Sequence, residues 1–580
     1  MRYPTVAEKV ADLLSRMTPD EKTGQMVQIS KDGIRPGEIQ EYFIGSALSP
    51  GGGFPHDNTP AGWLEMVNGF QAEALETRLG IPLLYGVDAV HGHGNMVGAT
   101  IFPHQIGLGA TRNPDLVRRI GEATAREILA TGIHWNFAPV LVSAQDIRWG
   151  RTYETYSEDI ATASELATAY LLGLQSLPPG FDPAPGQTIY TLATPKHFLG
   201  DGGTEWGTSR TADYQLDQGD RAIDEAGVRR LFLPPYRQAV SQGALSIMPS
   251  YSSLNGIKMH ASSYWLTDVL KGELGFPGLV ISDLDAVQQL GDDDHEAVVT
   301  AVNAGVDMLM ISSDFSLLKQ LRRGLENGDI PPARVDDAVR RILHVKFALG
   351  LFDRPFGDPG LQGTIGSDAH RQLARQAVRE SLVLLKNEGE TIPISRDAKL
   401  LYVAGSKADS TGSQCGGWTV DWQGSNASLQ PGTTILEGIR ALAGAGTRVE
   451  YEPSGEFEGM ADAGIVVVGE NPYAEGAGDR DDLGLSGADV QLIERMRAHS
   501  KRLVVILLSG RPMIITGQLP LADAWVAAWL PGTEGGGVAD VLFGDHPFAG
   551  KLPYTWHKSM DQVPHKQGDE PLFPLGYGLS

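Results

Sequence analysis

The sequence predicts an α/β protein of two domains, a parallel (β/α) barrel followed by a smaller α/β sandwich. Its 580 residues are too many for one hydrophobic core. Up to about Leu351, short apolar runs alternate with helical patterns, which is typical of parallel strands joined by helices. A segment dense in Gly and Pro then precedes a second series of strands and helices.

The predicted strands of the first part each end in polar or charged residues. In chain order they are "IPLLYGVDAVHG", "IHWNFAPVLV", "YTLATPKHFLGD", "GALSIMPSYSSLNG", "PGLVISDLD" and "AGVDMLMISSD". The helix "NPDLVRRIGEATAREILATG" has Asn113 as its cap, Pro114 in its first turn and Gly132 as its stop. The helix "PPARVDDAVRRILHVKFALGLF" closes the series. So many strand-then-helix units in one segment favour a barrel.

The predicted domains are residues 1–352, a linker over 353–369, and residues 370–580. The linker "DRPFGDPGLQGTIGSD" has no clean periodicity. In the second domain the predicted strands are "AKLLYVAGS", "AGIVVVGEN", "RLVVILLSGRP" and "AWVAAWLPG", separated by helices such as "SGADVQLIERMRAHS". Five or so strands are too few for another barrel, so we expect a parallel sheet in a three-layer sandwich.

Composition narrows the choice of ligand. The formal net charge is −24, from 71 acidic and 47 basic residues, which opposes binding to nucleic acid or to an anionic membrane. The single Cys415 excludes an internal disulfide framework, and no apolar run approaches the roughly 20 residues of a membrane span. The N-terminus reads as two helix starts rather than a signal peptide. We expect a cytoplasmic protein, or a periplasmic or secreted one if a leader was removed.

Ionisable residues gather where the predicted barrel strands end. They are Asp88, Arg151, Lys196, His197, Tyr251 and Asp283. Each alone could be structural, as a helix cap or a salt bridge. Together they occupy the face where barrel active sites lie. Their mixture of donors and acceptors suits a neutral, polyhydroxylated ligand.

Two loops of the second domain add candidates. "QCGGWTVDWQG" places Trp418 and Trp422 among glycines, where indole faces could stack on sugar rings. "VVVGENPYAEGAGDRDDLGLSG" is a strand followed by a polar loop with Glu475, and alone it would read as a solvated acidic loop.

No metal or cofactor is expected. His91 and His93, with His104 further on, do not have the i, i+4 spacing of a helical zinc site. "GDDDHE", from Asp292 to Glu296, could bind calcium but reads better as a solvated helix start.

These stretches resemble the family 3 glycoside hydrolases, most closely the plant and bacterial exo-acting β-D-glucan glucohydrolases and β-glucosidases. The resemblance is carried in order by "YGVDAVHGHGNMVGATIFPHQIGLGATRN", "RWGRTYETYSED", "PKHFLGDGGT", "SYSSLNGIKMHAS", "LVISD", "QCGGWTVDWQG", "GENPYAEGAGD", "LLSGRP", "AAWLPGTEGGGVADVLFGD" and "PLFPLGYGLS". It covers essentially the whole chain. It implies a (β/α)8 TIM-type barrel followed by an (α/β)6 sandwich, with the active site between them.

The resemblance also implies roles for residues. Asp283 would be the catalytic nucleophile and Glu475 the acid/base. The positions that hold the terminal glucose would be Asp88, Arg151, Lys196, His197, Met248 and Tyr251. We expect Arg151 and Lys196 to keep Asp283 ionised, and burial or the charge of Asp283 to keep a proton on Glu475.

The function implied is a retaining, exo-acting β-glucosidase. It would release glucose from the non-reducing ends of β-1,3/1,4-linked gluco-oligosaccharides, as a monomer or homodimer that needs no cofactor. A β-xylosidase of the same family is an alternative, because only the room near the sugar C6 separates the two. A catalytically inactive carbohydrate-binding homologue is a third reading, which the presence of Asp283 and Glu475 opposes. A β-N-acetylglucosaminidase is disfavoured, since those enzymes have a histidine in a "KHFPGHG" loop where this chain has Asp201.

The sequence departs from its relatives at the leaving-group side. In the plant enzymes a tryptophan follows the nucleophile and faces a second one at the position of Trp422, whereas this chain has Leu284. We therefore expect a tight glucose pocket and a more open leaving-group site. Trp206, in "TEWGTSR", is a candidate replacement surface. Asp285 is expected to be a helix cap or a contact at the barrel rim.

Overall fold

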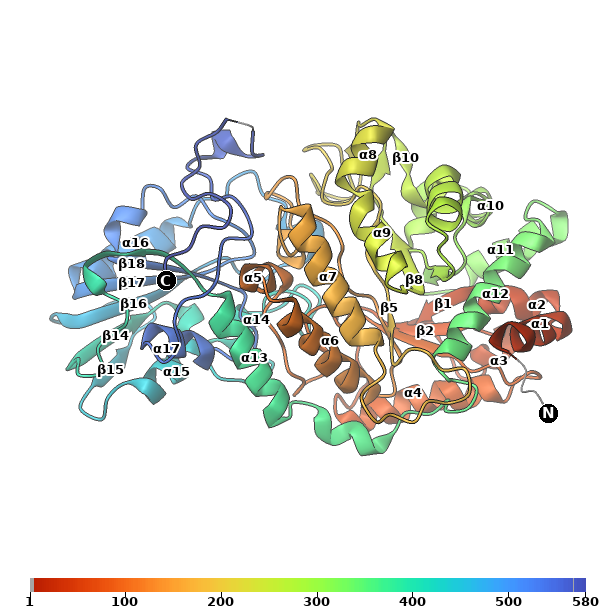
Figure 1. Cartoon of the computed structure of the whole chain (residues 1–580), viewed down its shortest axis with the longest axis horizontal. Coiled ribbons are helices and arrows are strands. Elements are labelled where there is room, and N and C mark those ends of the chain that lie inside the picture. Colours follow the sequence, from red (N-terminus) through yellow and green to blue (C-terminus); the bar gives the residue numbers. More distant parts are fainter. Residues whose placement is uncertain (1–4, 567) are drawn as a thin grey trace.

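The structure is a computed structural model that describes residues 5–566 and 568–580. The first four residues of the predicted N-terminal domain lie outside the described residues. Figure 1 shows two lobes side by side, an N-terminal lobe that contains α1 to α12 and a C-terminal lobe that contains α13 to α17. Both lobes mix strands and helices, so the predicted α/β class is confirmed.

Parallel strands form the centre of the N-terminal lobe. One six-stranded sheet has the order β12-β1-β2-β3-β4-β5, and a three-stranded sheet has the order β11-β8-β6. The first comprises β1 (Val27–Ser30), β2 (Ser46–Ser49), β3 (Leu84–Val87), β4 (Trp135–Asn136), β5 (Leu192–Ala193) and β12 (Leu309–Ile311). The second comprises β6 (Lys196–Phe198), β8 (Ser246–Pro249) and β11 (Leu279–Val280). Parallel bridges join Val140 to Lys196 and Ile281 to Met308, an arrangement consistent with a barrel.

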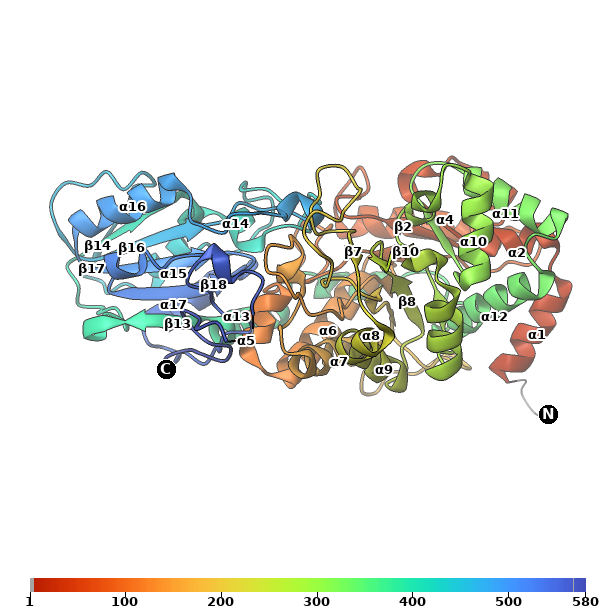
Figure 2. The ribbon, with the colours of Figure 1, turned by 90° about the horizontal axis from the view of Figure 1, so that it is seen from above.

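Helices surround these strands (Figures 1 and 2). α6 begins after Asn113, whose side chain accepts a hydrogen bond from the Leu116 N–H, and it ends shortly before Gly132, as predicted. The helices of this lobe are α1 (Val6–Arg16), α2 (Pro19–Gln25), α3 (Glu38–Tyr42), α4 (Pro60–Leu75), α5 (Gln105–Thr111), α6 (Pro114–Leu129), α7 (Ile160–Gln175), α8 (Glu225–Leu231), α9 (Leu233–Ser241), α10 (Asp294–Ala304), α11 (Ser316–Asn327) and α12 (Pro332–Ala348). A π-helix spans Tyr264–Glu273. β7 (Asp220–Arg221), β9 (Ser253–Leu254) and β10 (Ile257–Lys258) form a small separate sheet.

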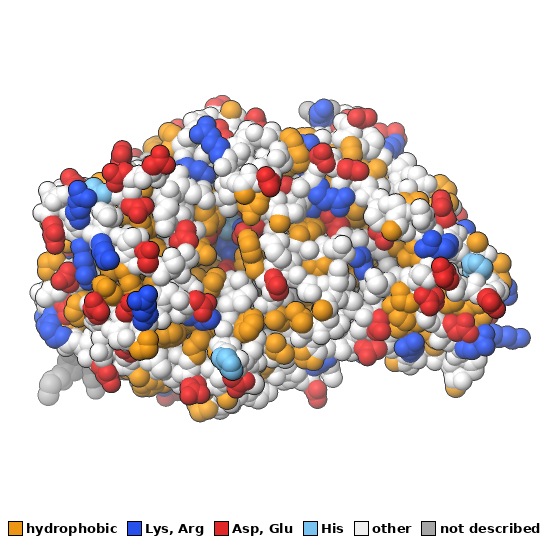
Figure 3. Space-filling view, turned by 180° about the vertical axis from the view of Figure 1, so that it is seen from behind, with side chains coloured by type: hydrophobic (Ala, Val, Ile, Leu, Met, Phe, Trp, Pro, Cys, Tyr) orange, Lys and Arg blue, Asp and Glu red, His pale blue; other side chains and the backbone are white. Residues whose placement is uncertain are grey.

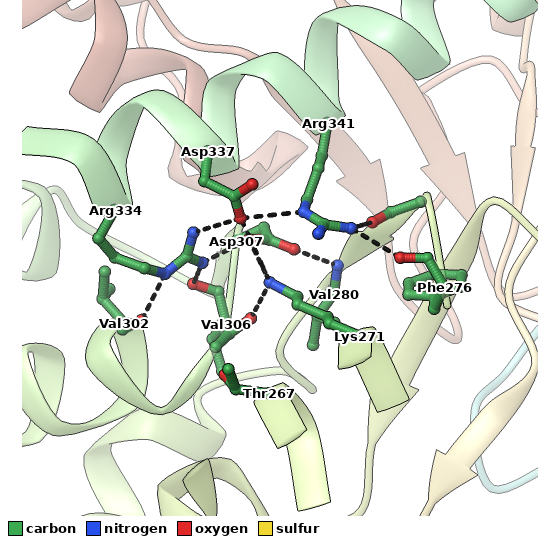
Figure 4. Close-up of polar contacts among 12 residues, drawn as sticks. Thr267, Lys271, Phe276, Val280, Val302, Val306, Asp307, Arg334, Asp337 and Arg341 are labelled. Atoms are coloured by element: carbon green, nitrogen blue, oxygen red, sulfur yellow. Dashed lines mark hydrogen bonds and ion pairs between the residues drawn. The ribbon is translucent and has the colours of Figure 1, made fainter. Parts of the chain in front are cut away.

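A buried ion cluster ties the helices to the strands at the start of β12 (Figure 4). Asp307 accepts hydrogen bonds from Lys271 Nζ at 2.7 Å, from the Val280 N–H at 2.8 Å, and from Arg334. Because Asp307 is fully buried, it needs all of these partners. The cluster lies at the amino ends of the strands, opposite to the ends where the predicted site residues lie.

The C-terminal lobe contains one six-stranded sheet of order β13-β18-β17-β16-β14-β15. Its strands are β13 (Val383–Asn387), β14 (Leu400–Ala404), β15 (Arg448–Tyr451), β16 (Ala461–Gly469), β17 (Ser500–Leu508) and β18 (Ala524–Trp529). The prediction of an all-parallel sheet is wrong at one edge, because β13 pairs antiparallel with β18. Its helices are α13 (Asp368–Ser381), α14 (Thr411–Cys415), α15 (Ile435–Leu442), α16 (Gly487–Ala498) and α17 (Gly536–Leu542).

Both faces of this sheet are buried. Along β17, Leu503, Val505 and Leu507 pack in one hydrophobic cluster. The alternate residues Val504 and Ile506 pack in another. Since successive strand residues point to opposite faces, a run that is apolar throughout marks a sheet covered on both sides.

The segment between the lobes is partly helical. A 3₁₀ helix spans Pro359–Thr364, and α13 begins at Asp368, inside the predicted linker. Over the part of the chain that the structure describes, no helix has the length and apolar character needed to cross a membrane.

Candidate active site

Eleven residues that the sequence assigns to the catalytic and substrate-binding site line one pocket of about 370 Å³. They are Asp88, Arg151, Lys196, His197, Met248, Tyr251, Asp283, Leu284, Trp418, Trp422 and Glu475. The first eight belong to the N-terminal lobe and the last three to the C-terminal lobe. Figure 3 shows the face opposite to that of Figure 1, where a hollow near the middle of the molecule has basic side chains at its floor.

Asp283 lies just beyond the carboxyl end of β11. Its N–H donates to Nε2 of His260 at 3.1 Å, and its Oδ1 accepts from the Leu284 N–H at 2.7 Å. Its Oδ2 is 3.6 Å from Nε2 of His197. Asp283 therefore does not cap the helical turn that follows, and one carboxylate oxygen is directed toward the pocket residues.

Burial and charge act in opposite directions on Asp283. Burial raises the pKa of its carboxyl above the usual value, while His197, Lys196 and Arg151 lower it. Arg151 and Lys196 lower the pKa of Asp283, as expected, but burial raises it by more.

Glu475 begins a 3₁₀ helix, Glu475–Gly478, in the loop that follows β16. Its backbone has φ of +54°, a conformation that costs free energy for a residue with a side chain. Its Oε1 accepts a hydrogen bond from Nη1 of Arg151 at 3.0 Å, and Nη2 of Arg151 is 2.9 Å from Glu154. Burial raises the pKa of Glu475 to about 8; Arg151 opposes this shift, and the charges of Asp217 and Asp283 add to it.

The loop that carries Glu475 is fastened to the N-terminal lobe by Asp479. The Asp479 carboxylate accepts hydrogen bonds from the backbone N–H groups of Gln215, Leu216 and Asp217 at 2.9, 2.7 and 2.9 Å. Its other oxygen accepts from the Gly150 N–H at 2.9 Å. Four N–H donors on one carboxylate fix the loop across the boundary between the lobes.

Glycines allow this close approach. A β-carbon at Gly150 would lie 1.9 Å from the backbone oxygen of Glu475, and one at Gly476 would lie 2.2 Å from the ring of Tyr214. Any side chain at either position would push the Glu475 loop away from the N-terminal lobe.

Buried polar groups line the rest of the pocket. Lys196 Nζ donates to Asp88 Oδ1 at 3.0 Å. Nδ1 of His197 is 2.6 Å from Oδ2 of Asp201. Burial, together with the charge of Arg151, holds the pKa of His197 well below its usual value, and burial raises the pKa of Asp201 to about 7. The chain thus presents an ammonium, an imidazole and carboxylates to the pocket, which suits sugar hydroxyls.

Two indoles form one wall of the pocket. The ring centroids of Trp418 and Trp422 are 6.5 Å apart at an angle of 70°. Lys196 Nζ lies 5.6 Å from the Trp418 ring. His91 and His104 stack with their centroids 3.5 Å apart and contact Thr419 and Gly417, so these histidines anchor the tryptophan loop.

Leu284 contributes an aliphatic side chain to the lining of the pocket. The Tyr251 hydroxyl donates to the Leu284 carbonyl, and Met248 lies beside Lys196 across the β6–β8 pair.

The expectation that Asp285 caps a helix is wrong, because its side chain makes no cap bond and instead accepts from the Ser312 N–H at 2.9 Å. This is a contact at the end of β12, the second of the two roles expected for Asp285.

The suggestion that Trp206 replaces the missing indole is also wrong. Trp206 is absent from the described lining of the pocket and lies under Arg148, whose Cζ is 4.5 Å from its ring. The Asp292–Glu296 cluster is a helix start, as favoured, since Asp293 caps α10.

Sequence reasoning missed part of the lining. The additional residues are Leu48, Pro50, Gly51, Phe137, Thr211, Tyr214, Gln218 and Met310. Three of them belong to the long loop after β6, where neither periodicity nor a charged strand end marks a site. Leu48 belongs to β2, which was not predicted, and Pro50 and Gly51 come directly after this strand.

Comparisons with known proteins agree over the whole chain. The family described as "Glycosyl hydrolase family 3 N terminal domain" matches residues 18–345, and "Glycosyl hydrolase family 3 C-terminal domain" matches residues 382–580. The lysosomal beta glucosidase of Dictyostelium discoideum is 35% identical over 98% of this chain and 75% of its own. A beta-xylosidase of Formosa agariphila is 29% identical over 99% of this chain and 79% of its own.

A solved structure is also similar to this chain over its whole length. A mutant form of the exo-1,3/1,4-beta-glucanase (ExoP) of a Pseudoalteromonas species superimposes with a TM-score of 0.93 at 39% identity, covering 100% of this chain and 96% of that one. With both domains of the family matched, in order and over most of its length, the chain belongs to glycosyl hydrolase family 3.

Proposed function

We propose that this protein is a retaining, exo-acting β-glucosidase that releases glucose from the non-reducing ends of β-1,3/1,4-linked gluco-oligosaccharides. The observation that carries the proposal is the meeting of Asp283 and Glu475, from different lobes, in one small pocket. The similarity to a beta glucosidase and to an exo-1,3/1,4-beta-glucanase supports the choice of substrate.

In the proposed reaction, the Asp283 carboxylate attacks the anomeric carbon and forms a covalent glycosyl ester. Glu475 gives its proton to the departing glycosidic oxygen, so the leaving sugar departs as an alcohol. The ionised Glu475 then takes a proton from water, whose oxygen attacks the anomeric carbon and releases Asp283. The raised pKa of Glu475, about 8, supports its role as the acid at neutral pH.

The glucose ring would lie between Trp418 and the polar floor of the pocket. Asp88 and Lys196, which form an ion pair with each other, can both turn to sugar hydroxyls. Arg151 has an unpartnered buried Nε, which adds a donor near the reacting groups. A pocket of about 370 Å³ with a buried polar end suits one terminal sugar, and this favours exo action.

The finer architecture is part of the proposal. The parallel strand pairs and the bridges at the edges of the two sheets support a (β/α)8 barrel over residues 1–352. The doubly covered six-stranded sheet supports an (α/β)6 sandwich over residues 370–580. The active site would then depend on both lobes, so their relative position is part of the mechanism.

Release of nitrophenol from the β-glucoside and the β-xyloside tests the proposal. We expect the β-glucoside to be the better substrate by kcat/KM. A higher kcat/KM for the xyloside would favour the β-xylosidase reading, to which the Formosa agariphila relative gives some weight. No turnover of either substrate by pure protein would support an inactive carbohydrate-binding homologue.

A further inference from the structure

A second cavity adjoins the catalytic pocket. Its volume is about 910 Å³, larger than the pocket itself, and the two share Thr211 and Gln218 as lining residues. Its remaining walls come from residues 207–210, 219–220, 253, 256, 258 and 288–292, all in the N-terminal lobe. We name this cavity the side groove.

A hydrogen-bonded wall stands between the side groove and the pocket. Gln218 Oε1 accepts from the Thr211 hydroxyl at 2.9 Å and from Nε2 of Gln289 at 3.0 Å. Lys258 Nζ donates to Gln289 Oε1 at 3.0 Å and to the Tyr251 carbonyl at 2.7 Å. The wall is therefore fixed before any ligand binds, and it continues into Tyr251 of the pocket.

The side groove has the chemistry of a site for neutral, hydroxylated ligands. Hydroxyl and amide side chains such as Thr208, Ser209 and Gln288 line it. Its charged lining residues are balanced in sign, with two basic and two acidic side chains: Arg210, Lys258, Asp220 and Asp292. None of its described lining residues is aromatic. A ligand would be held by hydrogen bonds rather than by stacking, in contrast to the indole wall of the pocket.

The position of the side groove fits the leaving side of the substrate. Arg151 and Lys196 are buried in the pocket, whereas Thr211 and Gln218 are half-buried and border both cavities. An oligosaccharide whose terminal glucose occupies the pocket would leave the pocket past half-buried residues such as Thr211 and Gln218. We propose that the side groove binds glucosyl units of the leaving chain beyond the first one, so that longer neutral gluco-oligosaccharides are preferred over disaccharides. This inference rests on the proposed function.

Gly291 lines the side groove at a position where a larger side chain can be introduced. Its backbone is extended, with φ of 169°, which any residue can adopt. Apart from its two chain neighbours, no described residue has an atom within 4 Å of a β-carbon built there. Gly291→Trp should place a large side chain in the side groove without strain, and Gly291→Ala is the matched control.

The experiment compares kcat/KM for two-, three- and four-unit oligosaccharides of the β-1,3 and β-1,4 series. For the wild type we expect an increase of about fivefold or more from two to four units, on the scale of one additional hydrogen-bonded contact. Gly291→Trp should remove this increase, and Gly291→Ala should keep it. Nitrophenyl β-glucoside, which has no further sugars, should be cleaved equally by all three proteins.

Two results would overturn the inference. One is a flat dependence on length in a wild type that cleaves nitrophenyl glucoside. The other is an unchanged length dependence in Gly291→Trp. If no glucoside is cleaved at all, the proposed function fails instead, and calorimetric binding of the four-unit and two-unit sugars to the same three proteins tests the side groove directly.

Discussion

Arg151 joins the two carboxylates on either side of it, with Nη2 at 2.9 Å from Glu154 and Nη1 at 3.0 Å from Glu475. Glu154 belongs to the same lobe as Arg151, whereas Glu475 belongs to the other. The guanidinium therefore links the proposed acid/base to the lobe that carries the proposed nucleophile. Because Arg151 is buried, this link is shielded from solvent.

The pH dependence of kcat/KM should report Glu475. Its pKa of about 8 means that the required proton is lost as the pH rises through about 8, so activity should fall on that side. On the acidic side, activity should fall as Asp283 becomes protonated. This fall should lie above the ordinary pKa of an aspartate, because burial raises the pKa of Asp283. In Glu475→Gln the alkaline fall should disappear and kcat/KM for nitrophenyl glucoside should drop roughly 10²- to 10⁴-fold. Dinitrophenyl glucoside, whose leaving group needs no proton, should lose less; an equal loss would contradict the acid role.

Asp479 should matter for catalysis although it lies outside the pocket lining. In Asp479→Asn, an amide NH₂ group replaces one carboxylate oxygen and cannot accept from the backbone N–H groups that this oxygen now binds. The Glu475 loop should therefore shift, and kcat should fall roughly 10- to 100-fold. The alkaline limb of the pH profile should also move away from about 8, which a purely structural change would not cause. The exposed Asp481→Asn in the same loop is the control. An unchanged profile in Asp479→Asn would contradict this positioning role.

Leu284 should make the leaving-group site permissive. We expect similar kcat/KM values for cellobiose, laminaribiose, sophorose and gentiobiose. A single indole wall constrains the orientation of the leaving sugar only weakly. Leu284→Trp should lower KM about 2- to 10-fold for the linkages that stack well, the scale of one added aromatic contact. Uniformly strict selectivity in the wild type would refute the open-site account.

Asp217 should make the protein less stable as the pH rises. Burial raises its pKa to about 7 in the folded protein, against about 3.9 in an unfolded chain. Between these values the folded state holds a proton that the unfolded state has released, so the free energy of unfolding falls as pH rises through this window. In Asp217→Asn, whose Oδ1 can still accept from Trp149, Tm should fall less between pH 5 and pH 8 than in the wild type. The exposed Asp213→Asn should behave like the wild type, and an identical pH slope in Asp217→Asn would show that Asp217 is not the cause.

The strands found from the sequence were those with continuous apolar runs that end in polar residues, such as β3 before Asp88 and β11 before Asp283. β1 and β2 were missed because they contain Gln28 and Ser46, which look unlike a buried strand. In the fold these two side chains pair across neighbouring strands, since Gln28 Nε2 donates to Ser46 Oγ at 2.7 Å. Such pairing between distant segments has no local signal.

The candidate site was predicted through its charged residues and the family resemblance. What could not be predicted depends on how loops cross between the lobes. The hydrogen bonds of Asp479 join residues more than 260 positions apart, and Trp206 packs beside Arg148 instead of entering the pocket. The direction of β13 was likewise invisible, because an apolar run does not encode parallel or antiparallel pairing.

The most direct test of the account is azide rescue of Asp283→Ala on an activated aryl β-glucoside. We predict that the variant loses roughly 10³-fold or more of the wild-type kcat, because no nucleophile remains to form the glycosyl ester. Azide should restore turnover and give α-glucosyl azide, since the small anion attacks from the side that Asp283 vacates. Near-wild-type activity in the variant, or β-glucosyl azide as the product, would contradict the assignment of Asp283 as the nucleophile.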